Sequence, residues 1–184
     1  MASALENLLS PFGTSLTAVS VADADGPDMP LLYVNSAFET LTGYRSGDVL
    51  GRNCRFLQGP QTEPDAHERI RSALTRRQEI SICLLNYTAQ GTAFHNLLIL
   101  TPIQDASGRN LTLGCQYDLN SGRQQTQIED HLRDVDGVIS RLTFQDSPTE
   151  PWRQSLKSMQ MRSDSIKMLA YTYLRRMKIE DLSH

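Results

Sequence analysis

The sequence has few cysteines, no long apolar run and no recognisable export signal. Three cysteines in 184 residues form neither a disulfide framework nor a CxxC metal motif, so we expect reduced thiols and no metal site. The longest apolar runs, such as Leu97–Leu100, are too short to span a membrane. The N-terminal stretch lacks a basic region and carries Glu6, which argues against a signal peptide. These absences predict a soluble cytoplasmic protein without a membrane partner.

Charge is also sparse, and it is unevenly distributed. The net charge of −3 gives no general affinity for nucleic acid or anionic membranes. Residues 1–120 hold 8 basic and 12 acidic groups, whereas residues 121–184 hold 10 basic and 9 acidic groups. All lysines (Lys157, Lys167 and Lys178) lie in the last third. The length and this asymmetry predict one globular domain followed by a different kind of segment.

The first half of the chain alternates between short strand and helix patterns. Residues 1–12 carry apolar side chains at helical spacing and predict a short amphipathic helix. Two strand-like runs, 16–21 and 31–35, are separated by the turn-rich loop DADGPDMP. Helical pieces are predicted at 37–42, 51–58 and 65–77.

Three longer strand patterns follow, at residues 79–88, 92–104 and 110–119. Their connections, AQG and DASG, are short and suit hairpins. Two strands, several small helices and a three-stranded meander predict an α+β domain with one antiparallel sheet. The helices would cover one face of this sheet, and a ligand pocket would lie between them.

The last third of the sequence predicts two helices. Ile128, Leu132, Val135, Ile139 and Leu142 step by four and three residues, as in a heptad seam. A second stripe with the same spacing runs from Trp152 towards residue 179, after Pro148 and Pro151. Because such seams need apolar cover, a homodimer through residues 120–184 is the simplest expectation.

The segment GRNCRFLQG, residues 51–59, is the most distinctive in the chain. On a helix, Cys54 and Gln58 would be i, i+4 neighbours, and Arg55 and Gln58 would be i, i+3 neighbours. One turn would therefore present a thiol, a carboxamide and a guanidinium to one cavity. A cysteine by itself is more often a buried structural residue, so this pattern needs support from elsewhere.

That support comes from amides on the predicted strands. Asn86, Asn96 and Gln116 each interrupt an otherwise apolar run. A buried amide costs a few kcal/mol unless it is hydrogen-bonded, so three on neighbouring strands suggest a shared polar partner. Amides both donate and accept, which suits a heteroaromatic edge such as the pyrimidine ring of a flavin.

These residues carry a resemblance to a known family. From about residue 12 to residue 118 the chain resembles a LOV domain, the flavin-binding, light-sensing branch of the PAS fold. The matching stretches are YVNSAF (33–38), LTGY (41–44), GRNCRFLQG (51–59), IRSAL (70–74), LLNY (84–87), FHN (94–96) and GCQYD (114–118). The resemblance implies a five-stranded antiparallel sheet with flanking helices. It divides the chain into an N-terminal cap helix (1–12), a LOV domain (13–119) and a helical extension for output and dimerisation (120–184).

The resemblance also implies a photochemical site. FMN would lie between sheet and helices, and blue light would drive a reversible bond between the Cys54 sulfur and flavin C4a while N5 takes a proton. Asn86 and Asn96 would bind the pyrimidine edge. Gln116 would sense N5 and O4, and its amide would reorient once N5 becomes a donor. The signal would then leave through the C-terminal helices.

The remaining cofactor residues implied by the resemblance are Arg55 and Arg71 for the phosphate, Asn53 and Gln58 for the flavin or its ribityl chain, and Leu98. The two arginines favour a phosphorylated flavin, although FAD and riboflavin remain open. The chain departs from the family at Thr112, which is often aromatic, and at residues 118–120. We expect Cys83 and Cys115 to be packing residues, and strand alternation predicts that His95 points away from the flavin.

The sequence thus predicts a blue-light photoreceptor with an unidentified downstream protein partner and no enzymatic output domain. Two alternatives remain: a PAS interaction module that does not respond to light, in which Cys54 is structural, and a flavin redox sensor. Neither alternative requires a cysteine at position 54. The charges of the last helix are interpreted as the solvated flank of an amphipathic helix rather than a DNA-reading surface.

Overall fold

The computed structural model describes residue 13, residues 17–105 and residues 108–119. The predicted N-terminal helix (1–12) and the predicted helices of residues 120–184 lie outside the described residues, so these predictions stay untested by the structure.

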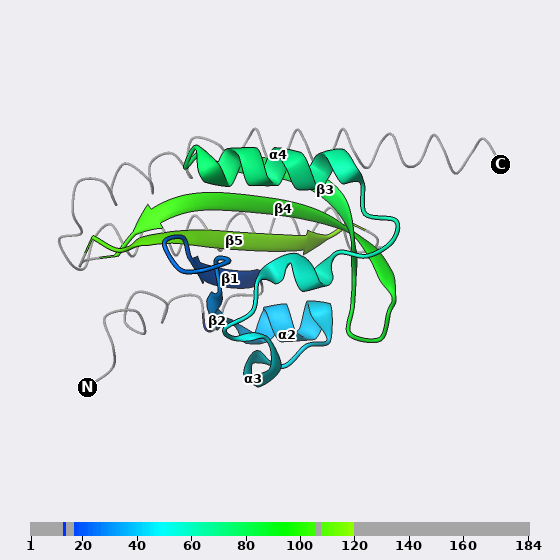
Figure 1. The fold of residues 1–184 in the computed structure, drawn as a ribbon. Helices are drawn as coiled ribbons and strands as arrows, with labels where there is room; N and C mark the ends of the chain where they lie inside the picture. Colours follow the sequence, from blue (N-terminus) through cyan, green and yellow to red (C-terminus); the bar gives the residue numbers. More distant parts are fainter. Residues whose placement is uncertain (1–12, 14–16, 106–107, 120–184) are drawn as a thin grey trace.

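The described residues form one antiparallel sheet of five strands (Figure 1). The strands are β1 (Ala18–Asp23), β2 (Leu31–Val34), β3 (Ile80–Tyr87), β4 (Ala93–Gln104) and β5 (Asn110–Asp118). Their order across the sheet is β2-β1-β5-β4-β3, which places the last strand in the centre and β2 and β3 at the edges. The predicted α+β class and the predicted five-stranded sheet are confirmed.

The two faces of the sheet carry different side chains, because successive residues of a strand point to opposite sides. One face carries Ser20, Leu84, Asn96 and Gln116, which line a cavity. The other face carries buried apolar side chains at the alternate positions: Val19, Val21, Leu97, Ile99, Leu111 and Leu113. The amides predicted on three strands therefore share one face, as the period of two requires.

Helices cover the cavity face. They are α2 (Ser36–Thr42), α3 (Ser46–Val49), the 3-10 helix η2 (Cys54–Leu57) and α4 (Pro64–Thr75). Phe38, Val49 and Leu57 pack with Ala18 and Leu31 at the β1–β2 end of the sheet. Ala66 of α4 packs against Ile82 and Leu84 at the β3 end. The two apolar clusters leave the middle of the face for the cavity.

Residues 51–63, which we call the roof segment, cross the cavity face from one edge strand to the other. At β2, the Gly51 N–H donates to the Leu31 carbonyl and the Leu31 N–H donates to the Arg52 carbonyl, both at 2.8 Å. At β3, the Thr62 hydroxyl donates to the Leu85 carbonyl at 2.5 Å and the Leu85 N–H donates to Glu63 Oε2 at 3.2 Å. Hydrogen bonds at both edges thus fix the height of this segment above the sheet.

The roof segment departs from the predicted helix of residues 51–58. Only Cys54–Leu57 is helical, as a single 3-10 turn, and Gln58 follows with an extended backbone at ψ 155°. The short helix α3 before it was not predicted. Attachment at two edges of the sheet stretches the segment, so a full α-helical turn does not form. Gly59 is required in this path, because a Cβ there would lie 2.4 Å from the ring of Tyr87.

Candidate functional site

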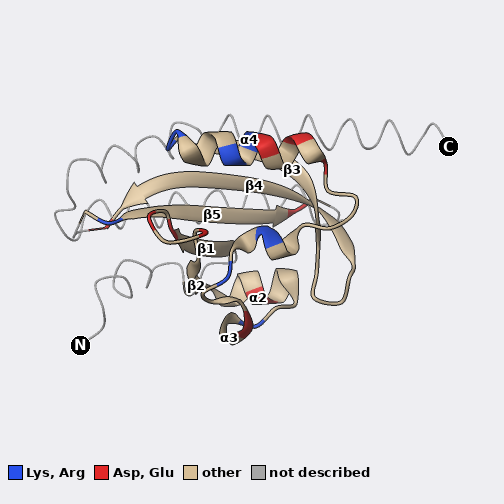
Figure 2. Cartoon of the chain, viewed as in Figure 1, with Lys and Arg blue, Asp and Glu red and all other residues tan. Residues whose placement is uncertain are grey.

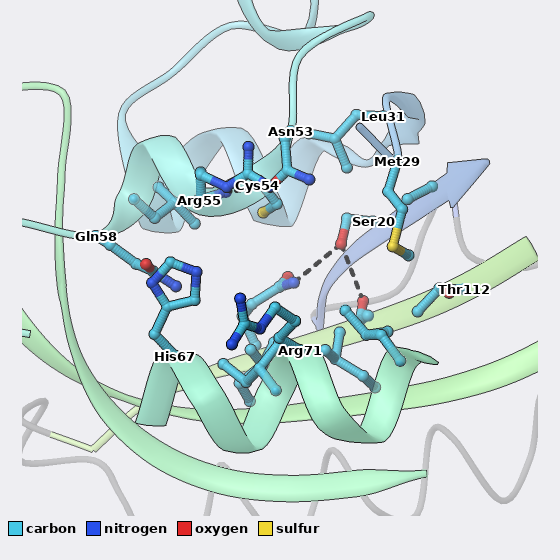
Figure 3. Close-up of a pocket in the computed structure, with 18 of the residues that line it drawn as sticks. Ser20, Met29, Leu31, Asn53, Cys54, Arg55, Gln58, His67, Arg71 and Thr112 are labelled. Carbon is cyan, nitrogen blue, oxygen red and sulfur yellow. Dashed lines mark hydrogen bonds between the residues drawn. The ribbon is translucent and has the colours of Figure 1, made fainter. Parts of the chain in front are cut away.

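A cavity of about 470 Å³ lies between the sheet, η2 and α4 (Figure 3). Its volume falls within the range of roughly 300–1,000 Å³ that is usual for sites of small organic ligands. All nine residues predicted for the site line it: Asn53, Cys54, Arg55, Gln58, Arg71, Asn86, Asn96, Leu98 and Gln116. Side chains that are separated by up to 63 positions in the sequence are therefore brought together, as predicted.

Cys54 is the first residue of η2 and faces the cavity. Asn53 caps this turn, since its Oδ1 accepts the Arg55 N–H at 2.9 Å. Figure 3 shows the Cys54 sulfur turned towards the space between η2 and α4. Burial raises the pKa of the Cys54 thiol to about 12. The sulfur at the cavity wall is therefore predominantly a protonated thiol at neutral pH.

The amides form a buried polar wall on the cavity face of β3, β4 and β5. Asn96 donates from Nδ2 to Asn86 Oδ1 at 2.8 Å, and the Tyr117 N–H donates to Asn96 Oδ1 at 3.1 Å. Gln116 lies directly across from Leu98 in the β4–β5 register. The three amides are at most 3% exposed. A ligand edge at this wall would meet donors and acceptors in alternation.

One atom of this wall has no partner within the described residues. Gln116 Nε2 donates to the Ser20 hydroxyl at 3.0 Å, whereas Gln116 Oε1 is buried and makes no hydrogen bond. Leaving a buried acceptor unsatisfied costs about 1–3 kcal/mol. Such a group in a cavity wall is explained by a ligand that presents a donor, or by a change in which the amide turns over.

Gly114 makes room beside this amide. A Cβ at position 114 would lie 2.6 Å from Ser20 Oγ and 3.0 Å from Gln116 Nε2. Both distances are too short for ordinary packing, so a side chain here would displace the polar pair. The absence of a side chain keeps the cavity floor flat between Gln116 and Leu100, which suits a planar ring system.

The two arginines predicted to bind a phosphate lie at the cavity, but each already has an acidic neighbour. Arg55 Nη1 lies 2.7 Å from the Asp28 carboxylate. Arg71 Nη2 lies 3.4 Å from Glu68 Oε1, one turn earlier on α4. Each of these four side chains is at least 50% exposed. Exposed ion pairs exchange partners at little cost. Guanidinium groups in this position could therefore receive an anionic ligand.

Several cavity residues were missed by the sequence analysis. They are Ser20, Asp28, Met29, His67 and Arg77. Ser20 carried a usable signal, because it interrupts the apolar run of β1 just as the amides interrupt theirs. Asp28 and Met29 belong to the loop between β1 and β2, for which turn-forming residues predicted a loop but no contact. Thr112, noted only as a departure from the family, also lines the cavity.

The other predicted non-site residues lie where strand alternation placed them. Cys115 is buried on the face of the sheet opposite the cavity, which confirms it as a packing residue. Cys83 is half-buried and, like the half-buried His95, is absent from the cavity wall. Burial raises the pKa of the Cys83 thiol to about 11 and that of the Cys115 thiol to about 12. Cys54 is therefore the one thiol at the cavity.

Two searches of the described residues gave negative results. No group of three or more His, Cys, Asp or Glu side chains is arranged to hold a metal ion in this part of the chain. Among the same residues, no helix has the length and hydropathy needed to cross a membrane.

Comparison with known families and curated proteins identifies relatives of the chain. A PAS domain model matches residues 17–121. A blue-light-activated histidine kinase 2 of Erythrobacter litoralis is 32% identical over 83% of this chain. A blue-light-activated histidine kinase of Rhizobium johnstonii is 44% identical over 59% of it. The chain spans 47% of the length of the first relative and 32% of the second, so both contain much that it does not match.

Comparison with solved structures also finds LOV proteins that resemble this chain. The LOV domain of a blue-light activated histidine kinase from Erythrobacter litoralis is 43% identical, with a TM-score of 0.52, over 55% of this chain and 94% of that one. A LOV protein of Rhodobacter sphaeroides is 28% identical, with a TM-score of 0.75, over 96% of this chain and 99% of that one.

Proposed function

Because this chain belongs to the LOV branch of the PAS domain family, we propose that it is a blue-light photoreceptor that binds FMN in the cavity. In this proposal the Cys54 sulfur forms a reversible bond with flavin C4a on illumination. The family membership supports the proposal of light sensing, since relatives of this chain are named for blue light. The cofactor and the chemistry rest on the site itself.

The observation that carries the proposal is the unpartnered Gln116 Oε1 in a wall that also contains Asn86 and Asn96. The pyrimidine edge of a flavin offers one N–H donor between two carbonyl acceptors, and N5 lies beside it. Two asparagines and one glutamine match that edge in type and number. An apolar ligand would leave the Gln116 acceptor unsatisfied.

The residues of the chain account for the reaction that follows light absorption. The flavin supplies the absorption of light and the electrophilic carbon. Cys54 would supply both the sulfur and the proton: its S–H bond would break, the sulfur would bond to C4a, and the proton would go to N5. Because the Cys54 thiol is protonated before illumination, the sulfur and the proton would both come from this one residue. The reverse transfer in the dark restores the thiol and needs no further reagent.

Gln116 converts the protonation of N5 into a change in the sheet. N5 without a proton is an acceptor, so dark-state FMN would draw Gln116 Nε2 away from the Ser20 hydroxyl, to which it donates in this structure. Once N5 carries a proton, it would need an acceptor such as Gln116 Oε1, so the amide would turn over and Nε2 would donate to Ser20 again. The contact between Gln116 on β5 and Ser20 on β1 would thus differ between dark and light.

In this proposal the segment that transmits the signal is residues 120–184, which follow β5. Its two heptad stripes suit a homodimer or a protein partner, in which light rearranges the helices. We place this receptor in the cytoplasm and assign it a sensory role without an enzymatic step of its own. Its downstream partner is a protein rather than nucleic acid.

Substitution of the reactive thiol tests the proposal directly. Cys54→Ala should retain the yellow flavin but lose reversible bleaching in blue light to below detection, because no sulfur remains at C4a. The matched control is Cys83→Ala, which removes a thiol outside the cavity and should bleach normally. Absorption spectra before and after illumination measure both variants.

Three outcomes would count against the proposal. Bleaching that persists in Cys54→Ala would assign the chemistry to another residue. A purified full chain that binds no flavin would favour a PAS interaction module without light sensitivity. A chain that binds flavin and changes colour only with reductants would favour a redox sensor.

A further inference from the structure

The loop between β1 and β2, residues 24–30, borders the cavity in a constrained conformation. Ala24, Asp28 and Met29 of this loop line the cavity. Asp28 and Met29 both have left-handed backbones, with φ of 62° and 50°. Two consecutive non-glycine residues in this region are unfavourable, so contacts elsewhere must hold the loop in place.

Those contacts come from the residues on either side of Cys54. Asn53 Nδ2 donates to the Asp28 carbonyl at 2.5 Å, and Arg55 Nη1 lies 2.7 Å from the Asp28 carboxylate. Asp28 is thus held by its backbone and by its side chain at once. The first contact is independent of charge, whereas the second uses the guanidinium predicted to bind a phosphate.

Asp25 of the same loop provides a useful contrast. Its carboxylate pairs with Arg77 at 3.0 Å and also accepts from Asn110 Nδ2 at 2.8 Å. Loss of the arginine would leave this carboxylate anchored to β5. For the Asp28 carboxylate, Arg55 is the one side-chain partner within the described residues, and the Asp28 side chain is 62% exposed. The Asp28 pair is therefore the more easily separated of the two.

The charges around the cavity show why separation of the Asp28–Arg55 pair would affect ligand binding. Figure 2 shows a basic residue on η2, both basic and acidic residues on α4, and acidic residues on the β1–β2 loop. A ligand phosphate carries about −1.5 to −2 charges and would approach Arg55. It would have to share Arg55 with the Asp28 carboxylate or displace it, whereas a neutral ligand would leave the pair intact.

We propose that Asp28 is a specificity-determining residue, a displaceable counter-ion of Arg55 that weakens binding of phosphorylated flavins relative to neutral ones. This inference rests on the proposed flavin site and extends it to ligand selection. Asp28 keeps Arg55 neutralised in the empty cavity and opposes the phosphate by like charge. Riboflavin, which lacks the phosphate, does not experience this opposition.

The test compares FMN and riboflavin in the full chain after removal of its flavin. Asp28→Asn is the appropriate variant, because asparagine tolerates the left-handed backbone that the loop requires. Exposed ion pairs contribute up to about 1 kcal/mol, so FMN should bind roughly two- to fivefold more tightly in the variant. Riboflavin affinity should stay unchanged, and the FMN gain should shrink at 1 M salt. Flavin fluorescence quenching measures all of these affinities.

Asp48→Asn is the matched control, since it removes the same charge from α3 at a position outside the cavity. It should alter neither affinity. Equal tightening of both flavins in Asp28→Asn, no change in either, or weaker FMN binding would each overturn the inference. The last result would show that Asp28 positions Arg55 for the phosphate instead. If the unmodified chain binds neither flavin, the proposed function itself fails, and this outcome is distinct from the other three.

Discussion

In the proposed function the chemistry depends on Cys54, and its neighbours Asn53 and Arg55 hold the turn in which it lies. Asn53 caps the 3-10 turn and binds the β1–β2 loop, while Arg55 pairs with that loop. The sequence predicted the cysteine, the three strand amides and the two arginines that line the cavity, but it missed others such as Asp28. It did not predict that Asn53 and Arg55 also hold a loop, because that contact depends on backbone geometry at Asp28, 25 or more positions away.

The protonation of Cys54 leads to a prediction about pH. Its pKa is raised to about 12 by burial, so the thiolate fraction at pH 9 is only ~0.1%. The thiol form is present throughout neutral pH and is lost only as pH rises towards 12. We therefore expect the amplitude of blue-light bleaching to stay constant from pH 6 to pH 9, measured under matched illumination. A tenfold rise per pH unit would show that the reaction needs a thiolate.

At the scale of elements, Asn35 joins three pieces of secondary structure at the end of the sheet. Its Oδ1 accepts from the N–H of Val19 and from that of Phe38, both at 2.9 Å, and its Nδ2 donates to the Thr17 carbonyl at 2.6 Å. One side chain at 3% exposure thus caps α2 and ties it to the beginning of β1. The cavity floor at Ser20 begins one residue further along.

Removal of this side chain should destabilise the fold measurably. Asn35→Ala leaves buried donors without a partner, and we expect a loss of about 2 kcal/mol in the free energy of unfolding. Thr40→Ala, on the exposed side of the same helix, should cost less than about 0.5 kcal/mol. Urea denaturation at equal flavin saturation measures both, since bound ligand adds its own stability. Equal losses in the two variants would contradict the role of Asn35.

The helices and strands also show which features of the fold local sequence patterns can predict. Strand patterns were predicted well, because alternation is local and the hairpin connections are short. The roof segment was predicted as one helix, and only a single 3-10 turn forms. Its shape is set by hydrogen bonds to Leu31 and Leu85, which belong to opposite edges of the sheet. No local pattern within residues 51–58 records those distant partners.

At the scale of the whole molecule, the proposed signal would have to pass from one buried amide to an extension of 65 residues. Gln116 is two residues before the end of β5, and Leu119 is fully buried next to the start of the extension. The face of the sheet opposite the cavity is apolar along β1, β4 and β5. A change at the β5–β1 junction would therefore affect the packing on that face as well as the segment that begins at residue 120.

This arrangement predicts a light-dependent change in residues 120–184. We expect illumination to alter either the elution volume of the full chain in size-exclusion chromatography or the hydrogen exchange of residues 121–184. Cys54→Ala should show neither change, since it cannot form the bond that starts the signal. Identical elution together with unchanged exchange in the unmodified chain would argue against these helices as the output.

The attachment of the roof segment to both β2 and β3 limits how this receptor can recruit a partner. Many proteins capture a peptide by adding its strand to an open sheet edge. Here the backbone of Leu31 at one edge and that of Leu85 at the other are already bonded to the roof segment. A strand added at either position would have to detach the segment that carries Cys54. Under the proposed function, strand addition there would disturb the light-sensitive site, whereas a partner that binds through helices would leave the roof segment in place.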